Sequence, residues 1–283
     1  MPEPRHQEEY EGRQTIAARR VLIDMGQVLA AFRTQMVIVG GWVPELGFEP
    51  QHEAPHVGSI DVDLALDIQK LSENAYAEMI DLLLNTGRYR QGRRPFQLIA
   101  TVDLKDGDAP VEVEVDFLAP PGDFRKHKPK LVENFRVLQF PACEVAFVAP
   151  RNITVSGAMM SGATNQVELL VPATADYLIM KAHAIDGRDK PKDVYDLCFA
   201  LERSPEGRAA MAEIWRERSG EKLVEKAVRI LKTKFESPQH FGPMALAEFH
   251  NAQDDDERDL YARRAYELVR DFLERLEVSR QPG

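Results

Sequence analysis

Two aspartates separated by one residue are the strongest candidates for chemistry in this chain. Asp61 and Asp63 lie in the segment GSIDVDLALD, residues 58–67, whose alternating apolar residues indicate a β-strand. Successive side chains of a strand point to opposite faces, so we expect both carboxylates on one face and the apolar residues in a core. The sequence therefore predicts two carboxylates held together on one strand.

A second acidic strand offers a further carboxylate. The segment VEVEVDF, residues 111–117, alternates strictly, which places Glu112, Glu114 and Asp116 on one face. Two carboxylates from one strand and one from a neighbouring strand can bind one or two Mg²⁺ (or Mn²⁺) ions, because these hard ions prefer oxygen ligands. The residues alone leave open whether Glu114 or Asp116 supplies the third carboxylate.

A glycine pair and a serine complete this set of candidates. Gly40 and Gly41 follow an apolar strand expected over residues 35–39, where small residues let backbone N–H groups approach phosphate oxygens closely. The hydroxyl of Ser59 can donate a hydrogen bond to the same phosphate group. Two metal ions can activate an attacking oxygen and stabilise a leaving pyrophosphate. Together these residues describe nucleotidyl transfer from an NTP.

The elements that must position these residues follow from hydrophobic periodicity and turn residues. We expect helices over residues 14–32, 72–86, 174–185, 192–203 and 261–276, with Ser72 capping the second, and about three amphipathic helices in all after residue 203. We expect strands over residues 35–39, 60–66, 96–104, 111–118, 135–140, 146–148, 153–155 and 167–171. The pattern predicts an α+β fold: a flexible tail over 1–13, an αβ domain with a small mixed sheet over 14–172, and a helical domain over 173–283.

The composition limits the classes of function. The net charge of −10 disfavours broad nonspecific attraction to nucleic acid, so any such binding must use local basic patches. Two cysteines in apolar surroundings indicate a reducing compartment, and no apolar run is long enough for a membrane span. We therefore expect a cytoplasmic protein. Two histidines, His52 and His56, lie near prolines and indicate a plain loop more than a zinc site.

At these motifs the chain resembles the nucleotidyltransferase superfamily of the DNA polymerase β type. That pattern is GG or GS, a DxD strand and a third carboxylate on an adjacent strand, here VEVDFL at residues 113–118. The segment MKAHAIDGRDKPKDVYDL, residues 180–197, is similar to the signature of the AbiEii-like branch, the toxin side of some bacterial toxin–antitoxin and phage-defence systems. The resemblance covers residues 37–200 approximately.

The resemblance implies roles for individual residues. Asp61, Asp63 and Asp116 would be catalytic metal ligands, since the motif places the third acid directly before two apolar residues. The triphosphate would contact Gly40, Gly41 and Ser59. In the helical domain Lys181 would bind nucleotide phosphates, and Asp193, with Asp196 as a further candidate, would match acidic residues on the following helix. Asp193 and Asp196 also suit a plain helix start, where carboxylates complement the helix dipole.

The resemblance leaves the acceptor open among RNA, protein and small molecules, and it implies an antitoxin protein as a partner. Trp42 stands where many AbiEii-like proteins have Thr or Ser. The resulting GGW opening, residues 40–42, resembles that of antibiotic nucleotidyltransferases of the aminoglycoside and lincosamide type. A non-catalytic nucleotide-binding protein of the same fold is a third interpretation. Two basic clusters are either solubilising loops or a surface for an anionic acceptor. Their members are Arg88, Arg90, Arg93 and Arg94, and Arg125, Lys126, Lys128 and Lys130.

Overall fold

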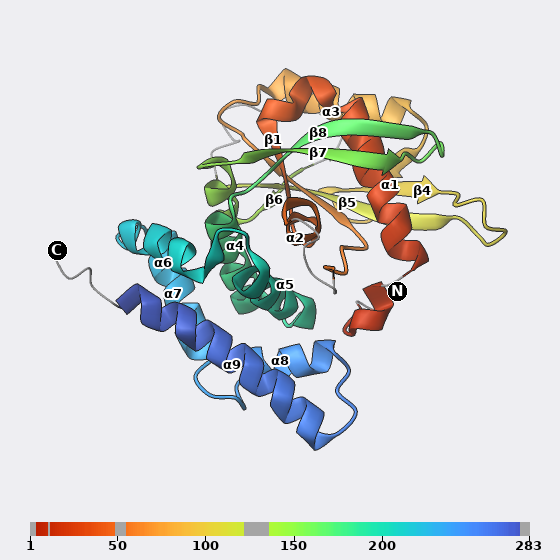
Figure 1. The fold of residues 1–283 in the computed structure, drawn as a ribbon. Coiled ribbons are helices and arrows are strands. Elements are labelled where there is room, and N and C mark those ends of the chain that lie inside the picture. Colours follow the sequence, from red (N-terminus) through yellow and green to blue (C-terminus); the bar gives the residue numbers. More distant parts are fainter. Residues whose placement is uncertain (1–3, 11, 49–54, 122–135, 278–283) are drawn as a thin grey trace. The chain divides into compact units, whose positions relative to one another are not determined.

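The computed structural model of the chain describes residues 4–10, 12–48, 55–121 and 136–277. Its internal contacts divide the chain into two compact units (Figure 1). The αβ unit comprises Tyr10–Gly47 and Val57–Ala173, and the helical unit comprises Met1–Glu9, Phe48–His56 and Thr174–Gly283. The predicted α+β class, with a mixed sheet and a helical C-terminal region, is confirmed.

A mixed sheet forms the centre of the αβ unit. Within the described residues its strands run in the order β1-β2-β5-β4-β3, and β6 pairs with β5. Strands β2 and β5 are parallel, whereas β1–β2, β3–β4 and β4–β5 are antiparallel. The bounds are β1 (Met36–Val39), β2 (Val62–Leu66), β3 (Tyr89–Gln91), β4 (Gln97–Val102), β5 (Val111–Ala119) and β6 (Leu138–Gln139). The β2–β5 pair therefore joins the two strands for which carboxylates are predicted.

Alternation along β5 explains why this segment is a strand. Val111, Val113, Val115 and Phe117 are buried, while Glu112 and Glu114 between them are exposed. One face of β5 therefore enters the core, and the acidic face is left for other contacts. Strand β2 starts at Val62, so Asp61 directly precedes the strand instead of lying within it.

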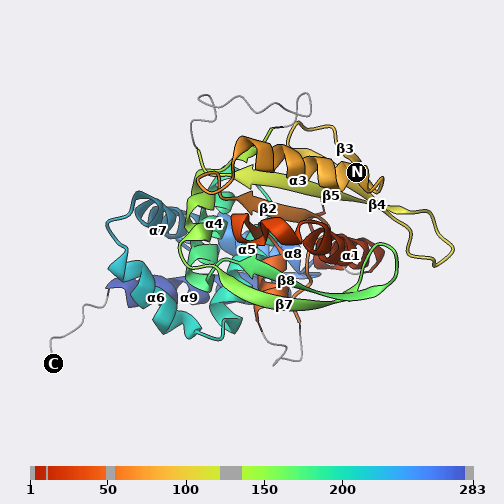
Figure 2. The same ribbon diagram turned by 90° about the horizontal axis from the view of Figure 1, so that it is seen from above.

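Helices and a hairpin complete the αβ unit. Helix α1 (Arg13–Val28) packs against the sheet and against the hairpin of β7 (Arg151–Ala158) and β8 (Thr164–Val171), as Figure 2 shows. Helix α3 (Glu73–Asn85) begins after Ser72, whose Oγ accepts a hydrogen bond from the Ala75 N–H at 3.2 Å. The predicted N-cap is confirmed, and it satisfies one of the unpaired amides of the first turn.

Three short 3₁₀ helices and one α-helix differ from the expected elements. The first predicted helix, expected to residue 32, ends at Val28. The chain continues as the 3₁₀ helix η2 (Ala30–Gln35), the tighter kind of helix that is common at the end of an α-helix, and then enters β1. The strand expected over 146–148 is wrong. This segment ends η3 (Pro141–Phe147), whose buried residues 142, 143, 145 and 146 have helical spacing. Helix α2 (Trp42–Gly47) was not expected, and η1 covers Gln7–Tyr10.

Residues 5–9, which fall in the expected flexible tail over 1–13, make specific contacts in the helical unit. The guanidinium of Arg5 pairs with Glu248 at 2.5 Å and with Asp189 at 3.5 Å. The carboxylate of Glu9 accepts hydrogen bonds from the backbone N–H groups of Arg5 and His6, each at 2.8 Å. The chain therefore turns at this point and attaches to the helices.

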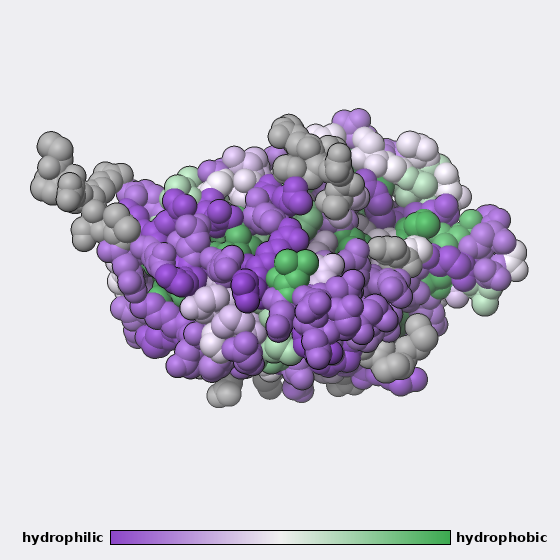
Figure 3. Space-filling view, turned by 60° about the horizontal axis from the view of Figure 1, so that its bottom comes forward, coloured by the Kyte–Doolittle hydropathy of each residue, from purple (hydrophilic) through white to green (hydrophobic). Residues whose placement is uncertain are grey.

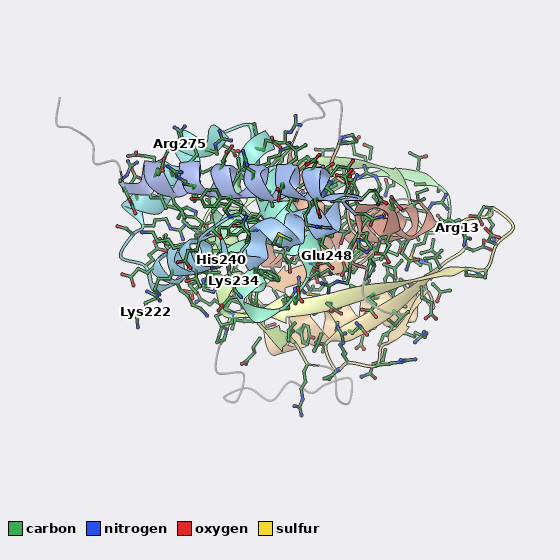
Figure 4. All side chains as sticks on the ribbon, turned by 90° about the horizontal axis from the view of Figure 1, so that it is seen from below. Arg13, Lys222, Lys234, His240, Glu248 and Arg275 are labelled. Carbon is green, nitrogen blue, oxygen red and sulfur yellow. The ribbon has the colours of Figure 1, made fainter. Side chains whose placement is uncertain are left out.

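The helical unit contains α4 (Thr174–Gly187), α5 (Pro191–Arg203), α6 (Gly207–Glu217), α7 (Lys222–Lys234), α8 (Phe241–Phe249) and α9 (Asp255–Glu277). Helices α8 and α9 lie side by side, and Figure 4 labels Glu248 on α8 and Arg275 toward the C-terminal end of α9. In the core of the helical unit, the indole N–H of Trp215 donates to the carbonyl of Ala175 at 2.9 Å. The Trp215 ring contacts Phe272 edge to face.

The surface seen in Figure 3 is mostly hydrophilic, and apolar side chains appear on it only in small separate areas. None of the helices in residues 4–277 that the structure describes is both long and apolar enough to cross a bilayer. Cys143 and Cys198 are buried thiols, and burial raises the pKa of each thiol well above its usual value.

Candidate active site

The register of β2 against β5 brings two of the predicted carboxylates to neighbouring positions. Asp63 on β2 is paired with Asp116 on the parallel strand β5. Asp61 lies two residues earlier, directly before β2. All three aspartates are partly buried, between fully exposed and core residues. The structure therefore places Asp61, Asp63 and Asp116 at one region of the sheet.

Asp116 lies in a partly buried position near two other acidic groups, Asp61 and Glu114. Burial, followed by the negative charges of Asp61 and Glu114, raises the pKa of the Asp116 carboxyl to about 6. A hydrogen bond from Gln97 and the charge of Arg94 act in the opposite direction without cancelling this effect. The guanidinium of Arg94 is 3.9 Å from Asp116 Oδ2. A bound cation would relieve this repulsion between carboxylates.

The glycine pair lies directly beside Asp63. Gly40 follows β1, has φ +72°, and faces Asp63 so closely that a Cβ atom there would lie 2.2 Å from Asp63 Oδ2. The register of β1 against β2, in which Val39 is opposite Asp63, causes this approach. Gly41 is buried between Gly40 and the start of α2. The glycine turn therefore lies against the Asp63 carboxylate, an approach that only a residue without a side chain allows. Its contact with phosphate stays a prediction.

Asp61 is oriented by two further side chains. The hydroxyl of Ser59 donates to Asp61 Oδ1 at 2.5 Å, and the indole N–H of Trp42 donates to the Asp61 backbone carbonyl at 2.7 Å. Both Ser59 and Trp42 are buried. The sequence predicts Ser59 as a phosphate contact, and the structure gives its hydroxyl a partner on Asp61. Trp42 therefore fixes the backbone at Asp61. In the sequence, only the place of Trp42 directly after the glycine pair could have indicated this contact.

The three aspartates fit a hard divalent cation in the chemistry of their donor atoms. They offer only carboxylate oxygens, which Mg²⁺ and Mn²⁺ prefer, and no thiolate or imidazole that would favour zinc. Among the residues that the structure describes, no three His, Cys, Asp or Glu side chains lie close enough together to hold a metal ion as they stand. Asp61, Asp63 and Asp116 are the residues that would hold such an ion.

The predicted site residues of the helical unit form a buried network of charges. Lys181 on α4 is 5% exposed, and its Nζ lies 2.8 Å from Asp193 Oδ1 and 2.6 Å from Asp196 Oδ2, both on α5. Arg188 also pairs with Asp193, at 2.6 Å, and Lys192 pairs with Asp196 at 2.7 Å. The predicted lysine and both predicted carboxylates are therefore in direct contact.

The pKa values in this network follow from compensation between opposite charges. Burial opposes ionisation of Lys181, but the charges of Asp193 and Asp196 outweigh it and raise the pKa of the ammonium. Burial likewise opposes ionisation of both carboxyls, yet the neighbouring cations hold the pKa of Asp193 and of Asp196 below the usual range. All three groups are therefore ionised at neutral pH.

Sequence reasoning missed the part of His56 in this network. Its Nε2 is 2.9 Å from Asp196 Oδ1, and its ring stacks with Tyr195 at a centroid distance of 5.1 Å. Burial lowers the pKa of His56 to about 4, so the ring is neutral and Nε2 carries the hydrogen given to the carboxylate. The companion prediction for His52 lies outside the described residues. A lone loop histidine gives no sequence signal for such a contact.

The first basic cluster is partly neutralised by carboxylates. Arg88 pairs with Asp24 at 2.9 Å and Arg90 with Glu112 at 2.6 Å. These partners reduce the cationic character that the sequence suggested for this stretch. The second cluster, Arg125, Lys126, Lys128 and Lys130, lies outside the described residues.

Comparison with known proteins identifies the family. No curated protein matches the chain significantly. A solved structure titled as an antigenic nucleotidyltransferase-like protein from Paracoccidioides brasiliensis is similar, with 14% identity, 74% of this chain and 93% of that chain covered, and a TM-score of 0.38. The family model described as nucleotidyl transferase AbiEii toxin, type IV toxin–antitoxin system, matches residues 30–278 and confirms the resemblance seen in the sequence. The chain therefore belongs to the AbiEii family of nucleotidyltransferase toxins.

Proposed function

We propose that this nucleotidyltransferase moves an NMP group from an NTP to an acceptor hydroxyl in a Mg²⁺-dependent reaction, and that it acts as a toxin. The observation that carries the proposal is the pairing of Asp63 with Asp116 on adjacent parallel strands, with Asp61 close enough to raise the pKa of Asp116. Family membership supplies the reaction class, and this cluster supplies oxygen ligands of the right kind.

Each group at the αβ site has a task in this proposal. Asp61, Asp63 and Asp116 would hold the ion, and a bound Mg²⁺ would supply charge neutralisation for the triphosphate and its leaving pyrophosphate. The turn at Gly40 and Gly41 offers backbone N–H groups to phosphate oxygens, since no Cβ intervenes. Ser59 and Trp42 hold Asp61 in place. One carboxylate near the acceptor accepts the proton of its hydroxyl.

The helical unit contributes a second set of predicted groups. Lys181 carries a positive charge at neutral pH that Asp193 and Asp196 hold in a fixed position. We propose that it binds nucleotide phosphate and that Asp193 maintains its orientation. The burial of Lys181 among carboxylates supports the orienting role of Asp193 most directly. A lysine that served only solubility would extend its ammonium group into solvent.

Membership of a toxin family also suggests an acceptor and a partner protein. We propose an RNA or a protein as the acceptor and an antitoxin protein as the partner, in line with the type IV toxin–antitoxin family. The antibiotic alternative was suggested by Trp42, but that side chain is 1% exposed and its indole donates to the backbone of Asp61. This contact supports a positioning role for Trp42 and gives no support to the antibiotic alternative.

A transfer assay tests the proposal. The full chain is incubated with each α-labelled NTP, Mg²⁺, total RNA and cell protein, and label in macromolecules is measured. We expect transfer by the parent chain, loss in EDTA, recovery with Mn²⁺, and a loss of at least about 100-fold in Asp63→Asn, as expected for removing a metal ligand.

Glu112→Gln is the matched control, because Glu112 lies on the same acidic face of β5 but is exposed and pairs with Arg90. Its activity should stay close to that of the parent chain. Transfer that is unchanged by EDTA or by Asp63→Asn would overturn the metal-dependent proposal. NTP binding without transfer to any acceptor would support a non-catalytic nucleotide-binding protein instead.

A further inference from the structure

A buried glutamine bridges the two carboxylates that compete for the third ligand position. Gln97 is the first residue of β4, lies opposite Asp116 in the antiparallel register, and is 2% exposed. Its Nε2 donates to Asp116 Oδ1 at 3.0 Å and to Glu114 Oε2 at 2.9 Å. The sequence alone left Glu114 and Asp116 as alternatives, and one side chain contacts both.

Simple chemistry fixes the direction of the Gln97 amide. Ionised carboxylates only accept hydrogen bonds, so the NH₂ group must face Glu114 and Asp116. The two hydrogens of Nε2 match the two acceptors, and the opposite orientation would bring the amide oxygen against negative charge. The side chain is therefore a specific connector between the two acids, and its donors are both used.

The loop between β3 and β4 holds Gln97 in this position. The Gly92 N–H donates to the Gln97 carbonyl at 2.8 Å, and the Gln97 N–H donates to the Arg94 carbonyl at 3.2 Å. A Cβ atom on Gly92 would lie 2.7 Å from both Cγ and Oε1 of Gln97. The absence of a side chain at Gly92 therefore leaves the space that the Gln97 side chain occupies.

This arrangement treats the two acids differently. Gln97 occupies Oδ1 of the partly buried Asp116, whose other oxygen, Oδ2, lies 3.9 Å from the Arg94 guanidinium. The exposed Glu114 is tied by Oε2 to the same amide. A carboxylate with one oxygen fixed by a neutral donor presents the other in a defined direction, which is the common task of residues that support metal ligands.

We propose that Gln97 is a positioning residue that selects Asp116 over Glu114 as the third metal ligand. It fixes the Asp116 carboxylate in one orientation and tethers Glu114 away from the ion. The proposal rests on the metal-dependent function proposed above. It assigns a role to a residue outside the GG, DxD and third-acid motifs.

The test measures Mn²⁺ binding to the full-length chain by electron paramagnetic resonance, with NTP absent, so that it does not depend on activity. Gln97→Met keeps the length and volume of the side chain but removes both donors. We expect Mn²⁺ affinity to fall by about 10- to 100-fold, the usual effect of losing such a supporting contact. Gln97→Asn keeps the amide but is too short to reach both acids, and should also lose affinity.

Three comparisons separate the outcomes. Gln91→Leu on the exposed part of β3 is the control for a glutamine change in this sheet, and its affinity should not change. Asp116→Asn should lose Mn²⁺ binding while Glu114→Gln keeps it. Adding Glu114→Ala to Gln97→Met should restore part of the affinity, because the competing acid is gone, and a purely structural role for Gln97 would not produce this rescue.

Unchanged Mn²⁺ binding in folded Gln97→Met and Gln97→Asn would overturn the role of Gln97 if Asp116→Asn still loses the ion. Unchanged binding in Asp116→Asn would instead overturn the proposed metal site itself. Circular dichroism and thermal unfolding verify folding, and if Gln97→Met does not fold, the result for Gln97→Asn decides.

Discussion

At the scale of single residues, the contact between Gly40 and Asp63 is the tightest constraint on the site. A Cβ atom on Gly40 would overlap Asp63 Oδ2, and φ +72° is unfavourable for any residue with a side chain. Strand pairing places the two residues together, since Val39 is opposite Asp63. Sequence patterns found this glycine, because a strand followed by GG is a strong local signal.

We predict that Gly40→Ala displaces the Asp63 carboxylate and lowers nucleotidyl transfer at least about 10-fold, the loss expected when a catalytic group moves by an ångström. Gly107→Ala is the matched control, because Gly107 also has positive φ (92°) but has nothing within 4 Å of its added Cβ. Positive-φ strain should cost each variant about 1 kcal/mol of stability, and the overlap with Asp63 adds to this loss in Gly40→Ala only. The activity assay contradicts the prediction if both variants lose transfer equally.

His56 gives the chain a pH-dependent contribution to stability. Burial lowers the pKa of the folded-state imidazole to about 4, whereas the unfolded value is about 6.5. The unfolded state therefore binds more protons between these values. The contribution is complete above pH 6.5 and is lost as the pH falls toward 4, at about 1.4 kcal/mol per pH unit.

We predict that the parent chain loses about 2 kcal/mol more unfolding free energy than His56→Gln between pH 7.5 and pH 5. The glutamine retains a donor for Asp196 but does not titrate. Urea unfolding at the two pH values measures the difference. His240→Gln, at a half-exposed histidine that pairs with Glu236, should keep the parental dependence. Equal losses in the parent chain and His56→Gln would show that the imidazole does not cause the effect.

At the scale of elements, the α4–α5 pair is joined by charges and not only by apolar contact. Lys181 projects from α4, while Asp193 and Asp196 project from α5 and bind it. The sequence predicted both helices from their periodicity, and family resemblance singled out these residues. The contact itself could not be derived, since spacing along one helix does not determine which side chain meets it from the next.

We predict that Asp196→Asn destabilises the helical unit by about 3–5 kcal/mol, because Lys181 and Lys192 would remain buried with less negative charge around them. Thermal or urea unfolding of the full chain measures the change. Glu202→Gln on the same helix breaks a more exposed pair with Arg264 and should cost about 1 kcal/mol or less. Similar losses in the two variants would contradict a special role for the buried network.

The elements that sequence reasoning missed share a physical cause. The segment 146–148 is apolar and short, so its strand-like composition could not be told from the end of a helix. In the structure Pro141 begins η3, and buried positions at three- and four-residue spacing cover the core. Helix α2 is only Trp42–Gly47 and contains Pro44, which hides it from periodicity. Long amphipathic segments such as α9 carry enough repeats to be recognised.

At the scale of the whole molecule, the sequence determined the class and the reaction but not the acceptor. The α+β class followed from an alternating β5 and a run of amphipathic helices, and the reaction followed from acids on two strands. Acceptor choice depends on surface shape and charge that motifs do not encode. Arg88 and Arg90, which suggested a basic surface, are paired with Asp24 and Glu112.

We predict that controlled expression of the chain in a bacterial host inhibits growth, and that Asp63→Asn abolishes the inhibition at equal soluble protein level. The reason is that toxicity by the proposed nucleotidyl transfer requires the carboxylates proposed to bind the metal, whereas toxicity from misfolding does not. Glu112→Gln, on the same acidic strand face, should remain toxic. Growth inhibition that persists in Asp63→Asn would contradict a catalytic toxin, and antibiotic resistance without growth inhibition would favour a small-molecule acceptor.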